Sequence, residues 1–276
     1  MSNESERVPG SRGPIVLLTD FGLSDPFVGQ MKGVIAGIAP GAHVLNLCHE
    51  VPPLNIMVAA MFLRGSCRYF PPGSIFIVVV DPGVGTGRKS VILKACDQYF
   101  VGPDNGCLWP MTELDESWQA VQIENPAYML PEISATFHGR DIFAPAAAHL
   151  ANGVPMSDFG SRVESLVPLA KSEIEFDEKK IRAEIVHFDH FGNAWTNIPK
   201  RFLEKIGWIE QSPRMVFNVA SCKVKGLERA YMTGELNKPI ALINSFDLVE
   251  IAWPGASAKD KLRLWLGVSV EVELRD

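Results

Sequence analysis

The first 165 residues alternate between short apolar runs and longer segments with helical spacing. Residues 75–80 are consecutive apolar side chains, which is typical of a strand buried on both faces. Residues 27–39 instead repeat apolar side chains at helical spacing, and Asp25-Pro26 before them favours a helix start. This alternation predicts an α/β domain with a mostly parallel sheet. The expected strands are 15–19, 43–47, 75–80, 89–96 and 99–101, and the expected helices are 27–39, 55–69 and 141–151.

The pattern changes in the last third of the chain. Residues 171–180 are polar and charged, as in a linker, and short strand-like runs with almost no helix follow them. Residues 268–274 alternate between apolar and polar side chains, as expected of a strand with one buried face. We therefore predict a smaller antiparallel all-β domain. The expected strands are 181–188, 195–198, 214–219, 239–243 and 262–274, and the expected parts are a flexible tail at 1–13, an α/β domain at 14–170, the linker at 171–180 and the β domain at 181–276.

Charge and composition argue against several kinds of partner and site. The 276 residues carry 26 basic and 32 acidic side chains, and the net charge of −6 argues against nucleic acid or an anionic membrane as partner. No apolar run is long enough to cross a membrane, and the polar N-terminus lacks the apolar core of a signal peptide. The 5 cysteines are odd in number and contain no Cys-x-x-Cys pair, which predicts reduced thiols in a cytoplasmic protein.

The apolar run at 75–80 leads directly into Asp81, Pro82, three alternating glycines and Arg88. Ligands bind at the carboxyl edge of open α/β sheets, so an acid at this strand end is a candidate site residue. A tight turn would let Arg88 fold back onto Asp81. The glycines also resemble a dinucleotide-binding loop, but that loop needs a following helix, whereas residues 89–95 are β-branched and short. We therefore interpret the segment as a hairpin with a glycine-rich tip.

Further acids and a histidine are candidates in the same domain. Asp20 and Asp25 follow the first strand, and His138 precedes a predicted helix. Asp25 and Asp141 have an alternative role as helix caps, which we favour for Asp141. His138 alone is more often structural than catalytic. Combined with Asp81 and Arg88, however, it could position a water molecule and remove its proton without a metal.

The second domain contains a polar and aromatic segment at 187–197. In an extended strand, His187 and Asp189 share a face, but a metal site would need another acid and no second cluster has ligand spacing. The segment is also consistent with a strand that leads to a polar turn. Its aromatic rings and amides suit a flat heteroaromatic ligand, for which rings stack and an amide binds an edge.

Together these segments resemble the S-adenosylmethionine hydroxide adenosyltransferase family, which is related to the adenosylmethionine-dependent fluorinase and chlorinase. Each segment alone is weakly specific, whereas the ordered set from residue 15 to about 255 is distinctive. The matching segments are Thr19-Asp20-Phe21-Gly22 with Asp25, Val80-Asp81-Pro82-Gly83-Val84-Gly85, Gly102-Pro103-Asp104-Asn105-Gly106, Thr136-Phe137-His138-Gly139-Arg140-Asp141, Phe191-Gly192-Asn193 through Thr196-Asn197-Ile198, and Asn244-Ser245.

The resemblance implies an α/β domain followed by a β-barrel-like domain, in a homotrimer with its sites between subunits. It implies hydrolysis of S-adenosyl-L-methionine to adenosine and L-methionine, with no cofactor and no metal. Asp81, Arg88 and His138 match the hydroxide-generating set. The implied substrate contacts are Asp20 for the ribose, Asp25, Asp189 and Ser245 for the methionine end, Phe191 and Asn193 for the adenine, and Phe137 and Asn244 within matching segments.

Three departures from the halogenase pattern affect the predicted site. Phe246 stands where the halogenases place an arginine for the methionine carboxylate, Leu54 replaces their tryptophan, and residues 252–255 lack the usual asparagine near adenine. Three alternative functions stay open at this point: a non-enzymatic adenosine or adenosylmethionine binding protein, a halogenase, and a calcium-dependent nucleoside hydrolase that uses the acids around Asp20.

Overall fold

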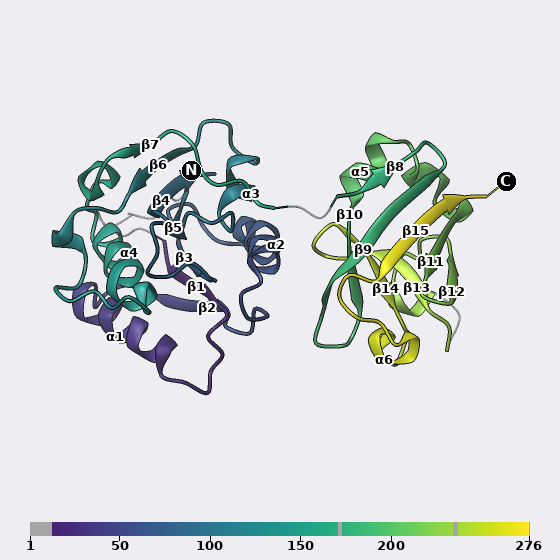
Figure 1. Cartoon of the computed structure of the whole chain (residues 1–276), viewed down its shortest axis with the longest axis horizontal. Coiled ribbons are helices and arrows are strands. Elements are labelled where there is room, and N and C mark those ends of the chain that lie inside the picture. The colour runs from purple at the N-terminus through teal and green to yellow at the C-terminus, as the bar shows by residue number, and fades with distance from the viewer. Residues whose placement is uncertain (1–12, 171–172, 234–236, 276) are drawn as a thin grey trace, which may run out of the picture. The chain divides into compact units, whose positions relative to one another are not determined.

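The computed structural model describes residues 13–170, 173–233 and 237–275. The chain divides into two compact units between Ala170 and Lys171, and each is described by itself (Figure 1). The flexible tail expected at 1–13 lies outside the described residues, apart from Gly13. No helix in the described part of the chain is long and apolar enough to cross a membrane.

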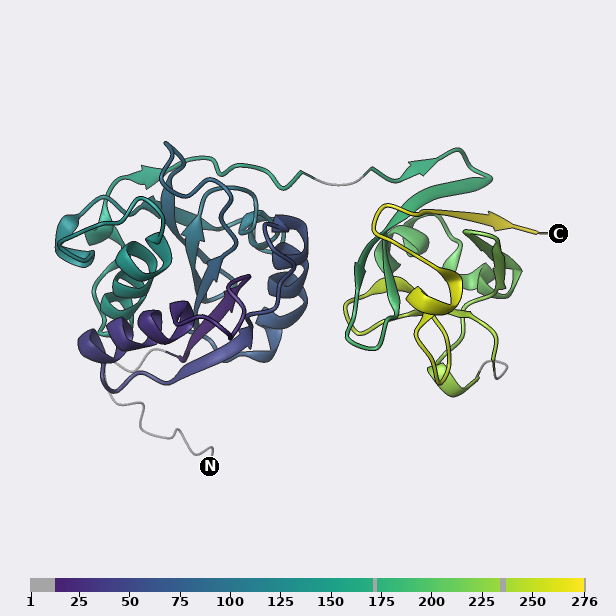
Figure 2. The ribbon, with the colours of Figure 1, turned by 60° about the horizontal axis from the view of Figure 1, so that its bottom comes forward.

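The first unit is built on a seven-stranded mixed sheet in the order β2-β1-β3-β5-β4-β6-β7 (Figures 1 and 2). The neighbours β2, β1, β3 and β5 pair in parallel, whereas β4, β6 and β7 are joined through antiparallel pairs. The strands are β1 Ile15–Thr19, β2 Val44–Cys48, β3 Ile75–Val79, β4 Ser90–Ala95, β5 Gln98–Pro103, β6 Gln119–Gln122 and β7 Arg162–Val163.

The order of these strands corrects one expectation. We expected β3 and β4 to form a hairpin, but β5 lies between them and pairs with both. The loop at 81–88 therefore crosses the carboxyl end of β5 on its way from β3 to β4. As a result, residues just beyond β5 lie at the same sheet edge as Asp81.

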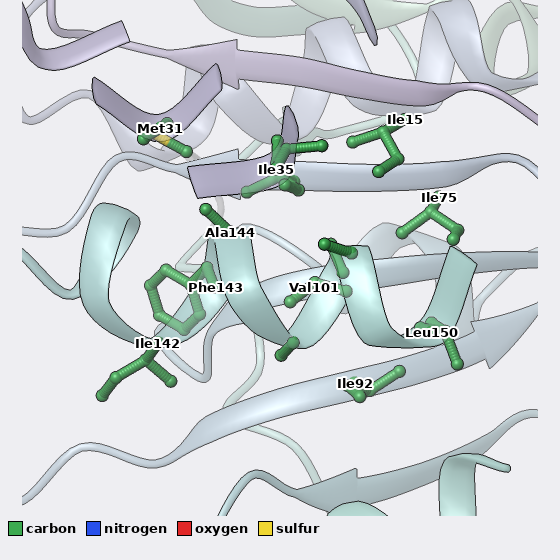
Figure 3. Close-up of a cluster of buried hydrophobic side chains, with 14 of the residues drawn as sticks. Ile15, Met31, Ile35, Ile75, Ile92, Val101, Ile142, Phe143, Ala144 and Leu150 are labelled. Atoms are coloured by element: carbon green, nitrogen blue, oxygen red, sulfur yellow. The ribbon is translucent and has the colours of Figure 1, made fainter. Parts of the chain in front are cut away.

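Helices cover both faces of this sheet, because its central strands are apolar on both sides. In β1, Ile15 and Leu17 pack into one buried cluster and Val16 and Leu18 into the other. Figure 3 shows the first cluster, in which Phe143 and Leu150 face the sheet. The helices are α1 Phe27–Ile38, α2 Ile56–Ser66, α3 Trp109–Thr112 and α4 Ala144–Ala151, with a π-helical turn at Gly139–Phe143 and short 3₁₀ turns at Cys67–Tyr69, Pro126–Tyr128 and Met156–Phe159.

The second unit is an antiparallel sheet that nearly closes on itself, as expected for a β-barrel-like domain. Its strands follow the order β12-β11-β15-β9-β10-β14-β13, and the two end strands of this order also approach each other. The strands are β8 Glu175–Phe176, β9 Lys180–Phe188, β10 Ala194–Pro199, β11 Met215–Val219, β12 Cys222–Lys225, β13 Ile240–Ile243, β14 Leu248–Ala252 and β15 Ser269–Leu274.

Several expectations for this unit are wrong. The segment expected as a linker contains β8, which pairs with β9. Helices α5 Lys200–Lys205 and α6 Ala258–Leu262 occur where almost none were expected, along with 3₁₀ turns at Ile209–Arg214 and Tyr231–Thr233. The strand expected at 262–274, with bends, begins only at Ser269; Leu262 ends α6, and Arg263 after it has a left-handed conformation with φ 52°.

Candidate active site

Asp81 and Arg88 form a buried ion pair at the carboxyl edge of the first sheet. Arg88 Nε donates to both carboxylate oxygens of Asp81 at 3.0 Å, and Nη2 donates to Oδ2 as well. Only 9% of the Arg88 side chain and 5% of the Asp81 side chain are exposed. The segment after Arg88 is the strand β4 and not a helix, so the structure lacks the helix N-terminus that a dinucleotide-binding loop requires.

His138 completes this cluster from a distant part of the chain. Its Nδ1 lies 2.8 Å from Arg88 Nη2. A guanidinium only donates hydrogen bonds, so Nδ1 must accept and the neutral ring carries its proton on Nε2. Burial, and secondly the positive charge of Arg88, lower the pKa of His138 below its usual 6.5. The ring is therefore neutral near pH 7 and offers Nε2–H as a donor.

The remaining nitrogen of Arg88 is also engaged. Nη1 donates to Ser90 Oγ at 2.8 Å and to the Lys89 carbonyl at 3.4 Å, and the guanidinium lies over the Phe143 ring at 5.3 Å. All three guanidinium nitrogens thus have protein partners. Arg88 orients Asp81 and His138 and contributes its positive charge to the site.

The glycine-rich loop packs directly against the segment that carries His138. Gly85 has φ +75°, and a Cβ at this position would overlap the carbonyl oxygen of Ala135. A side chain here would be strained both by its backbone conformation and by this contact. Gly85 therefore permits the close approach that brings Asp81, Arg88 and His138 together.

Asp20 lies at the neighbouring strand end, directly after β1. Its Oδ2 accepts from the Leu54 backbone N–H at 2.8 Å, and this bond holds Leu54 at φ 63°. The Leu54 side chain is 62% exposed. The carboxylate of Asp20 is thus fixed in place while it keeps further acceptor capacity for a ligand.

Asp25 and Phe137 belong to the same unit. The side chain of Asp25 is exposed and caps no helix, because α1 begins after Pro26 without a side-chain cap. Phe137 packs edge-on against Phe21 and Phe27, with ring centroids 5.6 and 5.2 Å apart. These contacts form an aromatic cluster next to His138 in sequence.

Our helix-cap interpretation of Asp141 is wrong. The fully buried Asp141 side chain accepts from the Ser134 backbone N–H at 2.8 Å and from Arg140 Nε at 2.6 Å. It lies inside the π-helical turn, where the backbone N–H of Asp141 reaches the Phe137 carbonyl. Asp141 therefore fixes the loop ahead of His138 to the turn that follows it.

In the second unit, Asp189 organises the turn that connects β9 to β10. Its Oδ1 accepts from the backbone N–H groups of Phe191 and Asn193, both at 2.9 Å, and its Oδ2 accepts from Asn193 Nδ2 at 2.9 Å. Gly192 has φ +80°, and a Cβ there would overlap Ser257. This rigid turn leaves the Phe191 ring 74% exposed.

A second turn of this unit connects β13 to β14. Asn244 Oδ1 accepts from the backbone N–H groups of Phe246 at 3.0 Å and Leu248 at 3.1 Å, and Ser245, between Asn244 and Phe246, is exposed. The Phe246 ring packs against Trp195 at 4.7 Å between centroids. The second turn therefore packs against β10 through this aromatic pair.

Two buried polar side chains were not anticipated from the sequence. Glu250 in β14 is 1% exposed and accepts from the Tyr231 hydroxyl at 2.9 Å, and burial raises the pKa of its carboxyl. His49 after β2 is 4% exposed, and its Nδ1 lies 2.9 Å from Thr19 Oγ1. The only sequence signal for Glu250 is an isolated acid within the apolar run at 248–252.

The structure brings one predicted set into contact and divides the others between the units. Asp81, Arg88 and His138 are in direct contact, and Asp20, Asp25 and Phe137 lie in the same unit. Asp189, Phe191, Asn193, Asn244 and Ser245 belong to the second unit. Among the described residues, no group of three or more His, Cys, Asp or Glu side chains is arranged to hold a metal ion.

Comparison with known proteins gives a consistent match. The S-adenosylmethionine (SAM) hydroxide adenosyltransferase N-terminal domain matches residues 15–160, and the corresponding C-terminal domain matches residues 183–271. The (R)-S-adenosyl-L-methionine hydrolase of Thermus thermophilus is 37% identical over 268 residues, which cover 94% of this chain and 99% of the relative. A fluorinase from an Actinoplanes species is 26% identical over 295 residues, covering 96% and 99%.

A solved structure agrees with these sequence matches. The crystal structure of an uncharacterized conserved protein from Thermotoga maritima has a TM-score of 0.85 and 36% sequence identity to this chain. The alignment covers 94% of this chain and 99% of that one. The chain therefore belongs to the SAM hydroxide adenosyltransferase family, as its sequence motifs indicated.

Proposed function

We propose that this protein hydrolyses S-adenosyl-L-methionine to adenosine and L-methionine. The observation that carries the proposal is the contact between Asp81, Arg88 and His138. The chain belongs to a family whose curated relatives include SAM hydrolases. A protein that only bound adenosine would have no need for a cluster of a buried aspartate, a buried arginine and a histidine. The acceptor of the adenosyl group is a water molecule.

The reaction is a substitution at the 5′ carbon of the ribose. The water oxygen forms a bond to this carbon, the carbon–sulfur bond breaks, and its electron pair neutralises the sulfonium as methionine leaves. The sulfonium needs no general acid, so the task of the site is to align and deprotonate water. Alignment alone contributes up to about 7–11 kcal/mol in well-oriented model reactions.

The hydrogen bonds within the cluster assign different tasks to its members. His138 Nδ1 is occupied by Arg88, so the ring holds the water oxygen through Nε2–H and does not act as the base. Asp81 is then the proton acceptor, and the fixed charge of Arg88 favours the forming hydroxide. The negative Asp81 also disfavours the approach of a halide ion, which would lose its hydration on entry.

The substrate-binding part of the proposal follows the family resemblance. We assign Asp20 to the ribose hydroxyls, Phe137 to the surrounding apolar wall, and Asp25, Asp189 and Ser245 to the methionine end. Phe191 supplies an exposed ring for adenine stacking, which its rigid turn supports. Asn193 supplies an amide for the adenine edge, and Asn244 holds the turn that presents Ser245.

The assembly and setting are also proposals from the resemblance. We propose a homotrimer whose sites combine side chains of neighbouring subunits, acting in the cytoplasm without a cofactor or resident metal. The only small molecules involved are SAM, water and the two products. Neither a nucleic acid nor a membrane is a partner in this scheme.

Incubation with SAM in ¹⁸O-labelled water at high chloride concentration tests the reaction. We expect adenosine with the label in its 5′ oxygen, together with L-methionine, as products identified by chromatography and mass spectrometry. Chlorodeoxyadenosine would indicate a halogenase, and tight binding without turnover would indicate a binding protein. Loss of activity on chelation of calcium would favour a nucleoside hydrolase.

A further inference from the structure

One motif of the first unit has no role in the scheme above. Asn105 follows β5, within the segment Gly102-Pro103-Asp104-Asn105-Gly106. Its Nδ2 donates to the Val80 carbonyl at 2.9 Å, and its Oδ1 accepts from the Cys107 backbone N–H at 3.2 Å. Its amide thus links the end of β5 to the residue directly before Asp81.

The bond to Val80 affects the orientation of Asp81. Val80 is fully buried and lies one residue beyond the end of β3, where the regular sheet pairing has ended. A buried carbonyl needs a hydrogen-bond partner, and Asn105 supplies it. Because the Val80 carbonyl and the Asp81 nitrogen belong to one planar peptide group, fixing the carbonyl fixes the point from which the Asp81 side chain projects.

The same segment also holds the other end of the glycine-rich loop. The backbone N–H of Asp104 donates to the Lys89 carbonyl at 2.9 Å, next to Arg88. The Asp104 carboxylate in turn accepts from the Val167 backbone N–H at 2.7 Å, and the side chain is 9% exposed. This anchored segment therefore contacts the residue before Asp81 and the residue after Arg88, because β5 lies between β3 and β4.

We propose that Asn105 is a positioning residue for the reaction, acting through the Val80 carbonyl to set the geometry of Asp81 and, through it, of Arg88 and His138. The expected change in kcat rests on the proposed hydrolysis, whereas the positioning of Asp81 and His138 by Asn105 does not. Asn105 itself contacts neither the water nor the substrate. Its loss should therefore reduce the rate of the chemical step more than substrate affinity.

The chain offers a closely matched control in Asn125. Its Nδ2 donates to the Asp158 carbonyl at 2.9 Å, and its Oδ1 accepts from the Ala127 backbone N–H at 3.0 Å. This asparagine makes the same two kinds of hydrogen bond in the same unit and is likewise half-buried. It has no bond to the loop at 81–88. If such an amide contributed only to the stability of the fold, replacing Asn105 and replacing Asn125 would change the activity to a similar extent.

The experiment compares Asn105→Ala, Asn105→Asp and Asn125→Ala in the full chain. Asn105→Asp keeps the acceptor for Cys107 and replaces the donor to Val80 with a charged carboxylate oxygen, so it breaks the same bond without removing the side chain if the alanine variant folds poorly. For both Asn105 variants we expect kcat to fall about a hundredfold, as for a misplacement near 1 Å, with KM within about threefold. Asn125→Ala should keep kcat within about twofold. An equal loss in the Asn105 and Asn125 variants, or a loss confined to KM, would overturn the proposal.

A second measurement does not depend on turnover. In ¹⁵N-histidine NMR spectra, with the His138 signals assigned through His138→Gln, wild type should show the Nε2–H tautomer. The Asn105 variants should shift these signals and raise the pH at which they titrate, whereas Asn125→Ala should not. Unchanged His138 signals in the Asn105 variants would refute the positioning role even if the wild-type protein did not hydrolyse SAM. Absence of wild-type turnover alone would refute only the proposed reaction.

Discussion

Replacement of Arg88 by methionine should destabilise the first unit strongly. The variant keeps much of the side-chain volume but removes the positive charge and every hydrogen bond to Asp81, His138 and Ser90. The Asp81 carboxylate, of which only 5% is exposed, is then left without its cation. Arg162 provides a matched control, since it pairs with Glu164 at 3.2 Å in the same unit with 70% and 78% of the side chains exposed.

The expected magnitudes of the two changes differ because of burial. Removing one member of a buried ion pair costs about 3–5 kcal/mol, since the remaining charge stays out of water. At about 2–4 °C per kcal/mol for a unit of this size, Arg88→Met should lower its Tm by about 6–20 °C. An exposed pair contributes about 0–1 kcal/mol, so Arg162→Met should lower the Tm by about 4 °C at most.

Differential scanning calorimetry can follow the first unit separately if the two units melt in distinct transitions. The double variant Asp81→Asn with Arg88→Met should recover about 1–3 kcal/mol of the loss, because it removes the unpaired charge. The reasoning is wrong if Arg88→Met costs no more than Arg162→Met, or if the effects of the Asp81 and Arg88 changes simply add. The control variant also reveals any general effect of losing an arginine.

Three further outcomes follow from the site. Asp81→Asn should leave a folded protein that binds SAM with turnover reduced at least about 10²-fold, and near wild-type turnover would exclude Asp81 as the proton acceptor. His138→Ala should lower kcat about 10²-fold with a smaller effect on binding; in wild type, kcat should hold through neutral pH and fall as the pH drops through the His138 pKa, which lies below 6.5. Analytical ultracentrifugation should show a homotrimer whose separated subunits are inactive, whereas a fully active monomer would contradict shared sites.

The sequence predicts those parts of the site that depend on local pattern. The apolar run at 75–80 identifies a buried strand, and the following glycines allow Arg88 to reach Asp81 seven residues away. Even so, the insertion of β5 between β3 and β4 was missed, because strand order depends on long-range pairing that local pattern does not report. The sequence suggested His138 as a partner of Asp81 and Arg88, but it could not show that the three side chains are in contact, since 50 residues separate His138 from Arg88.

Buried polar groups were the least predictable residues. Glu250 interrupts an apolar run, and a charged residue in a strand is usually exposed. Its carboxyl is nevertheless buried and accepts a hydrogen bond from Tyr231. Asp141 resembles a helix cap because it stands near a helix start, but its partners are Ser134 and Arg140. In both cases the residue's role depends on a hydrogen-bond partner that its own local sequence does not identify.

The distribution of side chains between the two units has an evolutionary consequence. Asp81, Arg88 and His138 all lie before Ala170, whereas the exposed Phe191 ring and the Asn193 amide lie after Lys171. Under the proposed function, the nucleophile and the nucleobase are selected by different compact units of the chain. On that proposal, a change of nucleophile would require substitutions in the first unit, and the adenine contacts of the second unit would not have to change. A lineage with this division of side chains would then be able to change its chemistry without first evolving a new binding site for the adenine.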